Sequence, residues 1–179
     1  HHLSILNSFV KRKDWAELEN YLSKMSKSIP SSELKLCENN AIDGVAGHYY
    51  HRYKDLEIPC VFKLELPKEL SVSEIDICLV LSNLLENALE ASMRTAPDKR
   101  RITVFARMHS DNVVLIKVEN FYNGVVKEKN GIFESSKHSG EGIGTQSVRR
   151  IAEKGGGYCR FTQKDSIFTA DVMLRGNSK

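Results

Sequence analysis

The stretch Asn83-Leu84-Leu85-Glu86-Asn87-Ala88-Leu89-Glu90-Ala91 lies inside a longer segment, residues 73–93, in which apolar residues recur every three or four positions. This period is that of an amphipathic helix, so we predict one helix over the whole segment. Its apolar residues fall on one face: Ile77, Leu81, Leu84, Leu85 and Ala88. Its amides and carboxylates fall on the opposite face, at i, i+3, i+4 and i+7: Asn83, Glu86, Asn87 and Glu90.

The polar stripe of this helix has the chemistry of a cation site. An asparagine side chain offers a neutral oxygen acceptor, and two such oxygens one helical turn apart can face the same hard cation. Mg²⁺ takes few protein oxygens and shares its coordination sphere with phosphates and water. The neutral side chains of Asn83 and Asn87 therefore suit a site where a nucleotide supplies the negative charge. The alternative is the ordinary solvated face of a surface helix.

A second motif, Gly140-Glu141-Gly142-Ile143-Gly144, opens a helix that we predict to end at Lys154, before three further glycines. Glycines let a phosphate approach the backbone, and the free N–H groups of a helix N-terminus favour an anion. The motif is not a P-loop, because no Gly-Lys-Ser/Thr follows it. The alternative is a flexible hinge in front of a capped helix.

The remaining elements are strands and one irregular stretch. Alternating apolar residues predict strands at 61–66, 101–108, 113–119, 158–162 and 167–174. Residues 121–140 have no sustained period, and so long a structureless segment is usually functional or disordered. Lys137 lies just before the glycines, where its ammonium group can pair with a phosphate. An ordinary surface loop is the alternative.

Two further helical regions precede these elements. Residues 1–28 have apolar positions at helical spacing, and the polar run at 11–14 divides them, with Asp14 as a cap for the second piece. We therefore predict a helical hairpin over residues 1–30 and one domain over residues 31–179. In that domain a helix is expected from residue 32 to residue 53, because a four-residue ladder runs through it: Leu34, Cys37, Ala41, Val45 and Tyr49.

Composition narrows the class of protein. The 179 residues include 26 Lys+Arg and 23 Asp+Glu, a net charge of +3, with basic and acidic residues interleaved. We therefore expect no nucleic-acid partner. No apolar run approaches the roughly 20 residues that span a bilayer. The four cysteines are isolated along the chain, so we expect reduced thiols of a cytoplasmic protein and no metal site of Cys or His ligands.

The order of these motifs resembles the GHKL (Bergerat-fold) ATP-binding domain of sensor histidine kinases. Residues 83–91 look like the N box of that family, and residues 140–148 look like its G2 box. Upstream, Cys37-Glu38-Asn39-Asn40-Ala41, expected on a helix, and the hairpin ending in Tyr21-Leu22 resemble the peptide-pheromone (agr-type) branch. The resemblance implies a two-layer α/β sandwich, with a mixed sheet on one side and three helices on the other, preceded by a partial helical hairpin.

The same resemblance implies a site for ATP and Mg²⁺. Asn87 would ligate the metal, and Asn83 would assist it or orient a phosphate. Glu90 would lie near the phosphates or their water shell, and Lys137 would help to neutralise phosphate charge, so that Asn83, Glu90 and Lys137 are the catalytic candidates. Residues 121–139 would form the ATP lid. Backbone groups facing the phosphates would come from Gly140, Gly142, Ile143, Gly144 and Thr145.

Asn120 stands where the G1 box of this family usually has an Asp that accepts a hydrogen bond from the adenine amino group. The Asn120 carbonyl can accept the same bond, although its NH₂ group adds a donor and the charge is gone. The glycines that usually follow are replaced by Phe121 and Tyr122. The alternative is that Asn120 caps the end of a strand and never meets the base.

The implied function is phosphoryl transfer in a two-component system. The parent protein would transfer the γ-phosphoryl group of Mg-ATP to its own histidine and then to an aspartate of a response regulator. His2 aligns best with a second histidine of the family, so the acceptor is expected upstream, with His1 as an outside candidate. We expect a homodimer through the hairpin, and a cytoplasmic domain that meets the inner or plasma membrane only through an upstream sensor region.

Three other functions stay open on the sequence. One is another ATPase of the same fold, such as an anti-sigma-type kinase or a chaperone-type ATPase, which the hairpin at residues 1–28 disfavours. The second is a nucleotide-binding or interaction module without kinase activity, which the replacement at Asn120 favours. The third is a structural dimerisation fragment whose nucleotide site is vestigial.

Overall fold

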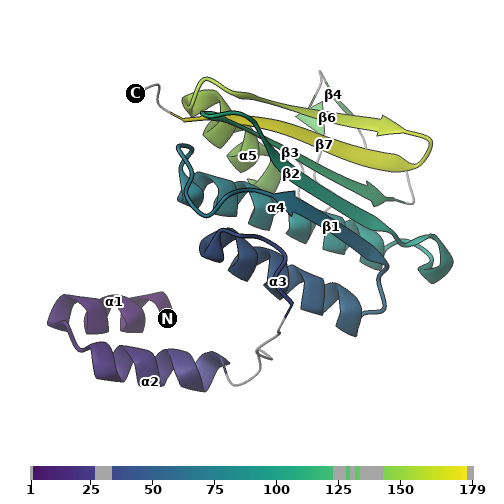
Figure 1. The fold of residues 1–179 in the computed structure, drawn as a ribbon. Helices are drawn as coiled ribbons and strands as arrows, with labels where there is room; N and C mark the ends of the chain where they lie inside the picture. The colour runs from purple at the N-terminus through teal and green to yellow at the C-terminus, as the bar shows by residue number, and fades with distance from the viewer. Residues whose placement is uncertain (1, 27–33, 123–127, 130–131, 134–142, 177–179) are drawn as a thin grey trace. The chain divides into compact units, whose positions relative to one another are not determined.

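The computed structural model describes residues 2–26, 34–122, 128–129, 132–133 and 143–176 (Figure 1). The chain divides into two compact units, His1–Glu33 and Leu34–Lys179. Each unit has its own internal architecture.

The first unit is a helical hairpin. Helix α1 spans His2–Arg12 and helix α2 spans Trp15–Ser26. Lys13 between them has a left-handed backbone, with φ 55°. Asp14 Oδ1 accepts a hydrogen bond from the backbone N–H of Glu17 at 3.3 Å. The predicted polar break, with Asp14 as the cap of the second helix, is therefore confirmed.

The second unit is built on a five-stranded mixed sheet with the strand order β1-β2-β3-β7-β6. Strand β1 runs parallel to β2, and the other pairings of this sheet are antiparallel. Each strand lies within two residues of the bounds that the sequence predicts. The strands are β1 (Cys60–Glu65), β2 (Ile102–Ser110), β3 (Val113–Phe121), β6 (Tyr158–Lys164) and β7 (Ile167–Arg175).

Helices cover one face of this sheet (Figure 1). They are α3 (Asn40–Asp55), α4 (Glu74–Met93) and α5 (Ile143–Lys154), and a short 3-10 turn, Pro97–Lys99, follows α4. Strand β3 shows the one-sided packing, because its core residues Val114, Ile116 and Val118 alternate with partly exposed ones. The predicted two-layer α/β sandwich with a mixed sheet is confirmed. Within the described ranges, no helix combines the length and the apolar character that crossing a bilayer requires.

Helix α4 begins where the sequence predicts. Ser73 precedes its first residue, and the Ser73 hydroxyl oxygen accepts a hydrogen bond from the backbone N–H of Asp76 at 3.2 Å. In the stretch 121–140 the prediction of no regular structure is wrong for five described residues. Phe121 is the last residue of β3, and the other four form two short antiparallel strands, β4 (Glu128–Lys129) and β5 (Ile132–Phe133).

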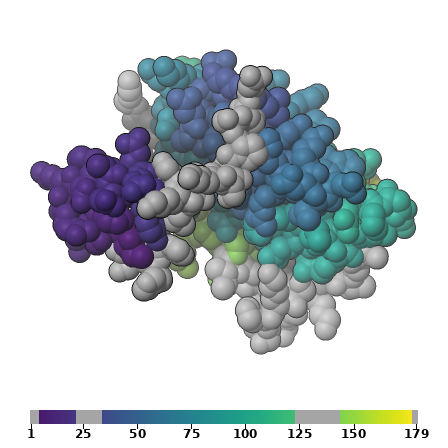
Figure 2. All heavy atoms as spheres, turned by 90° about the horizontal axis from the view of Figure 1, so that it is seen from below, coloured from purple at the N-terminus to yellow at the C-terminus, as the bar shows by residue number. Residues whose placement is uncertain are grey.

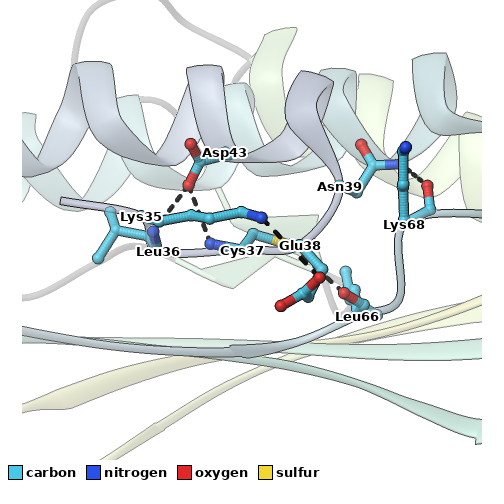
Figure 3. A network of polar contacts seen from close by, with 8 residues as sticks. All are labelled: Lys35, Leu36, Cys37, Glu38, Asn39, Asp43, Leu66 and Lys68. Atoms are coloured by element: carbon cyan, nitrogen blue, oxygen red, sulfur yellow. Dashed lines mark hydrogen bonds and ion pairs between the residues drawn. The ribbon is translucent and has the colours of Figure 1, made fainter. Parts of the chain in front are cut away.

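Helix α3 starts later than predicted. It begins at Asn40, so Cys37 precedes the helix, and the expectation that residues 37–41 lie together on a helix is wrong. The side chain of Asp43 in the first turn explains the difference. Its Oδ1 accepts hydrogen bonds from the backbone N–H groups of Leu36 and Cys37, at 2.7 and 2.9 Å (Figure 3). These bonds hold residues 36 and 37 beside the helix, where they cannot continue its axis.

Asn39 fixes this start by bonding in two directions. Its Oδ1 accepts from the backbone N–H groups of Ala41 and Ile42, which is an N-cap. Its Nδ2 donates to the carbonyl of Lys68 at 2.9 Å and to Glu74 Oε1 at 2.7 Å. Only 2% of the residue is exposed. Asn39 therefore joins the start of α3 to the start of α4.

We expect Asn39→Ala to lower the free energy of unfolding by about 2–3 kcal/mol, because it removes a cap and leaves buried polar partners unpaired. Urea denaturation measures the change. The control is Asn40→Ala, at the exposed neighbouring position, which should change the free energy by no more than about 0.5 kcal/mol. Equal effects of the two substitutions would contradict the role given to Asn39.

Candidate functional site

The candidate site lies where α4 meets the start of α5. A β-carbon added to Gly144 would lie 3.3 Å from Asn83 Oδ1, and equally close to both Oδ1 and Nδ2 of Asn87. Any side chain at position 144 would therefore press on both amides. The two motifs that the sequence predicts to act together are in contact, although more than fifty residues separate them in the chain.

The amide of Asn83 has a defined orientation. Its Nδ2 donates a hydrogen bond to the carbonyl of Leu79, one turn earlier, at 2.7 Å. This bond occupies the donor side of the group and leaves Oδ1 turned toward Gly144. Asn83 and Asn87 are both half-buried, so they remain accessible to a ligand. The arrangement offers neutral oxygens beside a helix N-terminus, which is suited to a cation shared with an anionic ligand.

Glu86 does not belong to the same surface as the two asparagines. Its Oε2 accepts hydrogen bonds from the Tyr49 hydroxyl at 3.1 Å and from the Arg52 guanidinium at 2.8 Å, so it faces α3. The prediction that Glu86 shares one face with Asn83 and Asn87 is therefore wrong. Glu90, one turn after Glu86, is half-buried.

Asn120 lies at the end of β3, between Ile102 of β2 and Phe168 of β7. It alternates with Glu119 and so points to the same side of the sheet as the core residue Val118, with 3% of its surface exposed. Its Nδ2 donates to the carbonyl of Phe121 at 3.1 Å. Because the donor side of the amide is engaged within the chain, the oxygen is the side that can receive a ligand.

Thr95 connects the neighbourhood of Asn120 with α4. The buried Thr95 hydroxyl donates to the carbonyl of Ala91 at 2.9 Å and lies 3.5 Å from the carbonyl of Phe121. Ala91 is one helical turn beyond Asn87, and a turn rises about 5.4 Å. Asn120 therefore lies near the C-terminal end of α4, whereas Asn83 and Asn87 lie near the middle of that helix. A ligand lying along α4 could reach both.

Several predicted residues lie outside the described part of the chain. They include Lys137, Gly140 and Gly142, together with most of the expected lid at 121–139. Ile143 is the first residue of α5, and Thr145 is half-buried in the first turn of that helix.

At the start of the expected lid segment, Tyr122 is held by two hydrogen bonds. Its N–H donates to the carbonyl of Ser166 and its hydroxyl donates to Gln163 Oε1, each at 3.0 Å.

A separate hollow of about 380 Å³ lies on the other face of the sheet. Its lining includes Lys63, Phe105, Leu115, Lys117 and Tyr158. On β3 these outward residues alternate with the core residues that face the helices. The hollow therefore opens away from the asparagine pair. Among the described residues, no group of three or more His, Cys, Asp or Glu side chains is arranged to hold a metal.

Sequence reasoning missed Tyr49, Arg52 and Thr95 as neighbours of the site. Tyr49 and Arg52 are three residues apart and so lie on one side of α3, a spacing that is visible in the sequence. Their partner Glu86 is more than thirty residues away, and only the packing of α3 against α4 brings the three together.

The model of the GHKL domain family matches residues 72–175, more than half of the chain. The chain belongs to the GHKL family. No curated protein sequence matches it. The match confirms the resemblance to GHKL domains that the sequence motifs carry.

Solved structures of histidine kinases share the fold of this GHKL domain. The catalytic domain of histidine kinase ThkA aligns with a TM-score of 0.59 and 19% identity, over 78% of this chain and 93% of that one. The mycobacterial sensor histidine kinase MprB aligns with a TM-score of 0.52 and 17% identity, over 78% and 95%. The Acinetobacter baumannii histidine kinase AdeS aligns with a TM-score of 0.56 and 15% identity, over 77% and 64%.

We expect Gly144→Ala to displace the two amides of α4 with little change in stability, because the added methyl group meets only side-chain atoms. The side-chain NH₂ resonances of Asn83 and Asn87 should shift in a ¹H–¹⁵N correlation spectrum. The control is Gly47→Ala in α3, where an added β-carbon meets no neighbouring atom. That substitution should stabilise the domain by about 0.5–1 kcal/mol without moving these resonances. Unshifted resonances in Gly144→Ala would contradict the contact.

Proposed function

We propose that this chain is the ATP-binding catalytic domain of a two-component sensor histidine kinase, of the peptide-pheromone (agr-type) branch. The observation that carries the proposal is the contact of Gly144 with Asn83 and Asn87 inside a GHKL domain. The likeness to histidine kinase catalytic domains supports it through the shared fold.

The asparagine pair is the proposed metal site. Asn87 ligates Mg²⁺, and Asn83 assists it or orients a phosphate. The residues present fit the ion, because two neutral oxygens lie beside Gly144 and no carboxylate of the described chain is needed to balance a nucleotide's own charge. When bound, Mg²⁺ supplies charge neutralisation on the phosphates. In this proposal Glu90 lies near the phosphates or their water shell.

The start of α5 is the proposed phosphate cradle. Gly144 in its first turn lies beside the asparagine pair, and a helix N-terminus favours an anion. Gly144 and Thr145 belong to the described part of the cradle. Gly140, Gly142 and Ile143 complete it in the proposal, with Lys137 as a further cation for the phosphates and residues 121–139 as the lid.

Asn120 is the proposed reader of adenine. Its Nδ2 is held by the carbonyl of Phe121, so its Oδ1 accepts a hydrogen bond from the exocyclic amine of the base. In this proposal the base lies at the C-terminal end of α4, beside the buried Asn120, and the phosphates lie near the middle of that helix.

The proposed reaction breaks the bond between the γ-phosphorus and its bridging oxygen and forms a bond from that phosphorus to a histidine nitrogen. The acceptor histidine precedes His2 in the parent protein, and the phosphoryl group then passes to an aspartate of a response regulator. The hairpin of α1 and α2 belongs to the dimerisation and phosphotransfer stalk in this proposal. His48 and His51 lie on α3, within the nucleotide-binding unit, and serve neither step.

Binding of Mg-ATP is the first test. We expect Asn87→Ala to weaken Mg-dependent ATP binding by about 1.5–3 kcal/mol, roughly ten- to hundredfold in Kd, while metal-free binding changes little. Titration calorimetry with Mg²⁺ and with EDTA measures both. The matched control is Asn40→Ala, an exposed asparagine at the start of α3. Equal Mg-dependence of Asn87→Ala and the unaltered chain would contradict the metal site.

Competition between ATP and GTP tests Asn120. A charged acceptor makes a stronger hydrogen bond to the adenine amine and rejects the guanine carbonyl more strongly, so Asn120→Asp should raise the ATP/GTP preference. Displacement of a fluorescent adenine nucleotide by each competitor measures the ratio. An unchanged ratio would place adenine recognition on other groups.

Acid-labile incorporation of labelled phosphate into the parent protein tests the kinase reaction itself.

A further inference from the structure

Three side chains of helix α3 donate hydrogen bonds to one turn of α4. The Tyr49 hydroxyl and the Arg52 guanidinium both donate to Glu86 Oε2, at 3.1 and 2.8 Å. The hydroxyl of fully buried Tyr53 donates to the carbonyl of Leu85 at 2.8 Å. Helix α3 covers the face of the domain seen in Figure 2, where it appears in blue. Three donors of one helix thus meet two consecutive residues of the next.

The two accepting residues, Leu85 and Glu86, come immediately before Asn87. Successive residues of a helix are rotated by about 100°, so Glu86 faces α3 while Asn87 faces Gly144 of α5. The same turn of α4 therefore carries a carboxylate on one side and a proposed metal ligand on the other. A phosphate chain beside Asn83 and Asn87 would lie within reach of the electrostatic field of Glu86.

Arg52 weakens the electrostatic field of Glu86 by pairing with its carboxylate. Its guanidinium lies over the ring of Tyr49, 5.7 Å from the ring centroid, which holds it beside the carboxylate. The Tyr49 hydroxyl stays a donor at physiological pH, because burial, and then its hydrogen bond with Glu86, raise its pKa to about 12. Glu86 is thus both neutralised by a cation and kept turned away from the asparagine pair.

We propose that Arg52, held on the Tyr49 ring, is a positioning residue for the nucleotide site: it neutralises Glu86 and holds it toward α3, so that the neutral amides of Asn83 and Asn87 face the phosphates without an unpaired carboxylate beside Asn87. This inference rests on the proposed function. It explains why a carboxylate next to Asn87 is compatible with a polyanionic ligand, since an unpaired charge at that point would repel the phosphates.

The chain contains a comparable ion pair away from the asparagine pair. Lys117 Nζ and Glu119 Oε1 are 2.7 Å apart on the other face of the sheet, with side-chain exposures of 43% and 31%. The exposures of Arg52 and Glu86 are 40% each. Lys117→Gln therefore leaves a carboxylate unpaired at similar exposure, away from the asparagine pair.

The experiment is a double-mutant cycle on the 179-residue chain, read by the Kd of metal-free ADP and by thermal unfolding. Arg52→Gln leaves Glu86 unpaired and should weaken ADP binding about five- to tenfold at low salt, with a smaller effect at 0.5 M NaCl. Glu86→Gln removes the charge and should not weaken binding. Arg52→Gln combined with Glu86→Gln should return the Kd to within about twofold of the unaltered chain. Lys117→Gln should leave it unchanged.

A purely structural tie would give a different pattern. Both single substitutions would then weaken binding in step with lower unfolding temperatures, and the combination would be at least as weak as either. That outcome, or an Arg52→Gln variant that binds like the Lys117→Gln control, overturns the inference. If the unaltered chain binds no adenine nucleotide, the proposed function fails instead. The two failures are therefore distinguishable.

Discussion

The contact between Gly144 and the amides of Asn83 and Asn87 is the constraint on which the candidate site depends. It brings the start of α5 against the middle of α4, and it favours glycine there, because an added β-carbon would lie 3.3 Å from both amides. Helix α4 has a fixed position because residues of its apolar face, such as Ile77, Leu81 and Leu85, are fully buried in the core. Burial of this kind gives the polar face a fixed direction.

The polar groups of α4 are divided between its two neighbours. Asn83 and Asn87 face the start of α5, and Glu86 is drawn to Tyr49 and Arg52 of α3. A helix that carried amides and carboxylates on one undivided face would present a mixed charge to any anion. The packing of α3 separates the charge from the amides, so the chemistry of the site depends on a helix that supplies no proposed ligand.

Asn39 gives α3 its own fixed position. Its four hydrogen bonds connect the first turn of α3 with Lys68 and with Glu74 at the start of α4. The two helices are thus tied at their N-terminal ends by Asn39 and further along by Tyr49, Arg52 and Tyr53.

The sequence by itself determined the elements whose signals are local. The apolar period of α4 and the alternation in the five strands depend on neighbours within a few residues, so they could be predicted closely. The order of the two boxes also predicted the family. Only the tertiary structure decided where α3 begins and which way Glu86 turns. The hydrogen bonds of Asp43 and Asn39 make α3 begin inside the apolar pattern that predicted an earlier start, and the spacing of apolar residues does not reveal such bonds. Asn39 also bonds to Lys68 and Glu74, which are distant in the sequence. Glu86 satisfies the angular rule for the polar face, but its partners stand on another helix, and the strong hydrogen bond to Arg52 outweighs the local pattern.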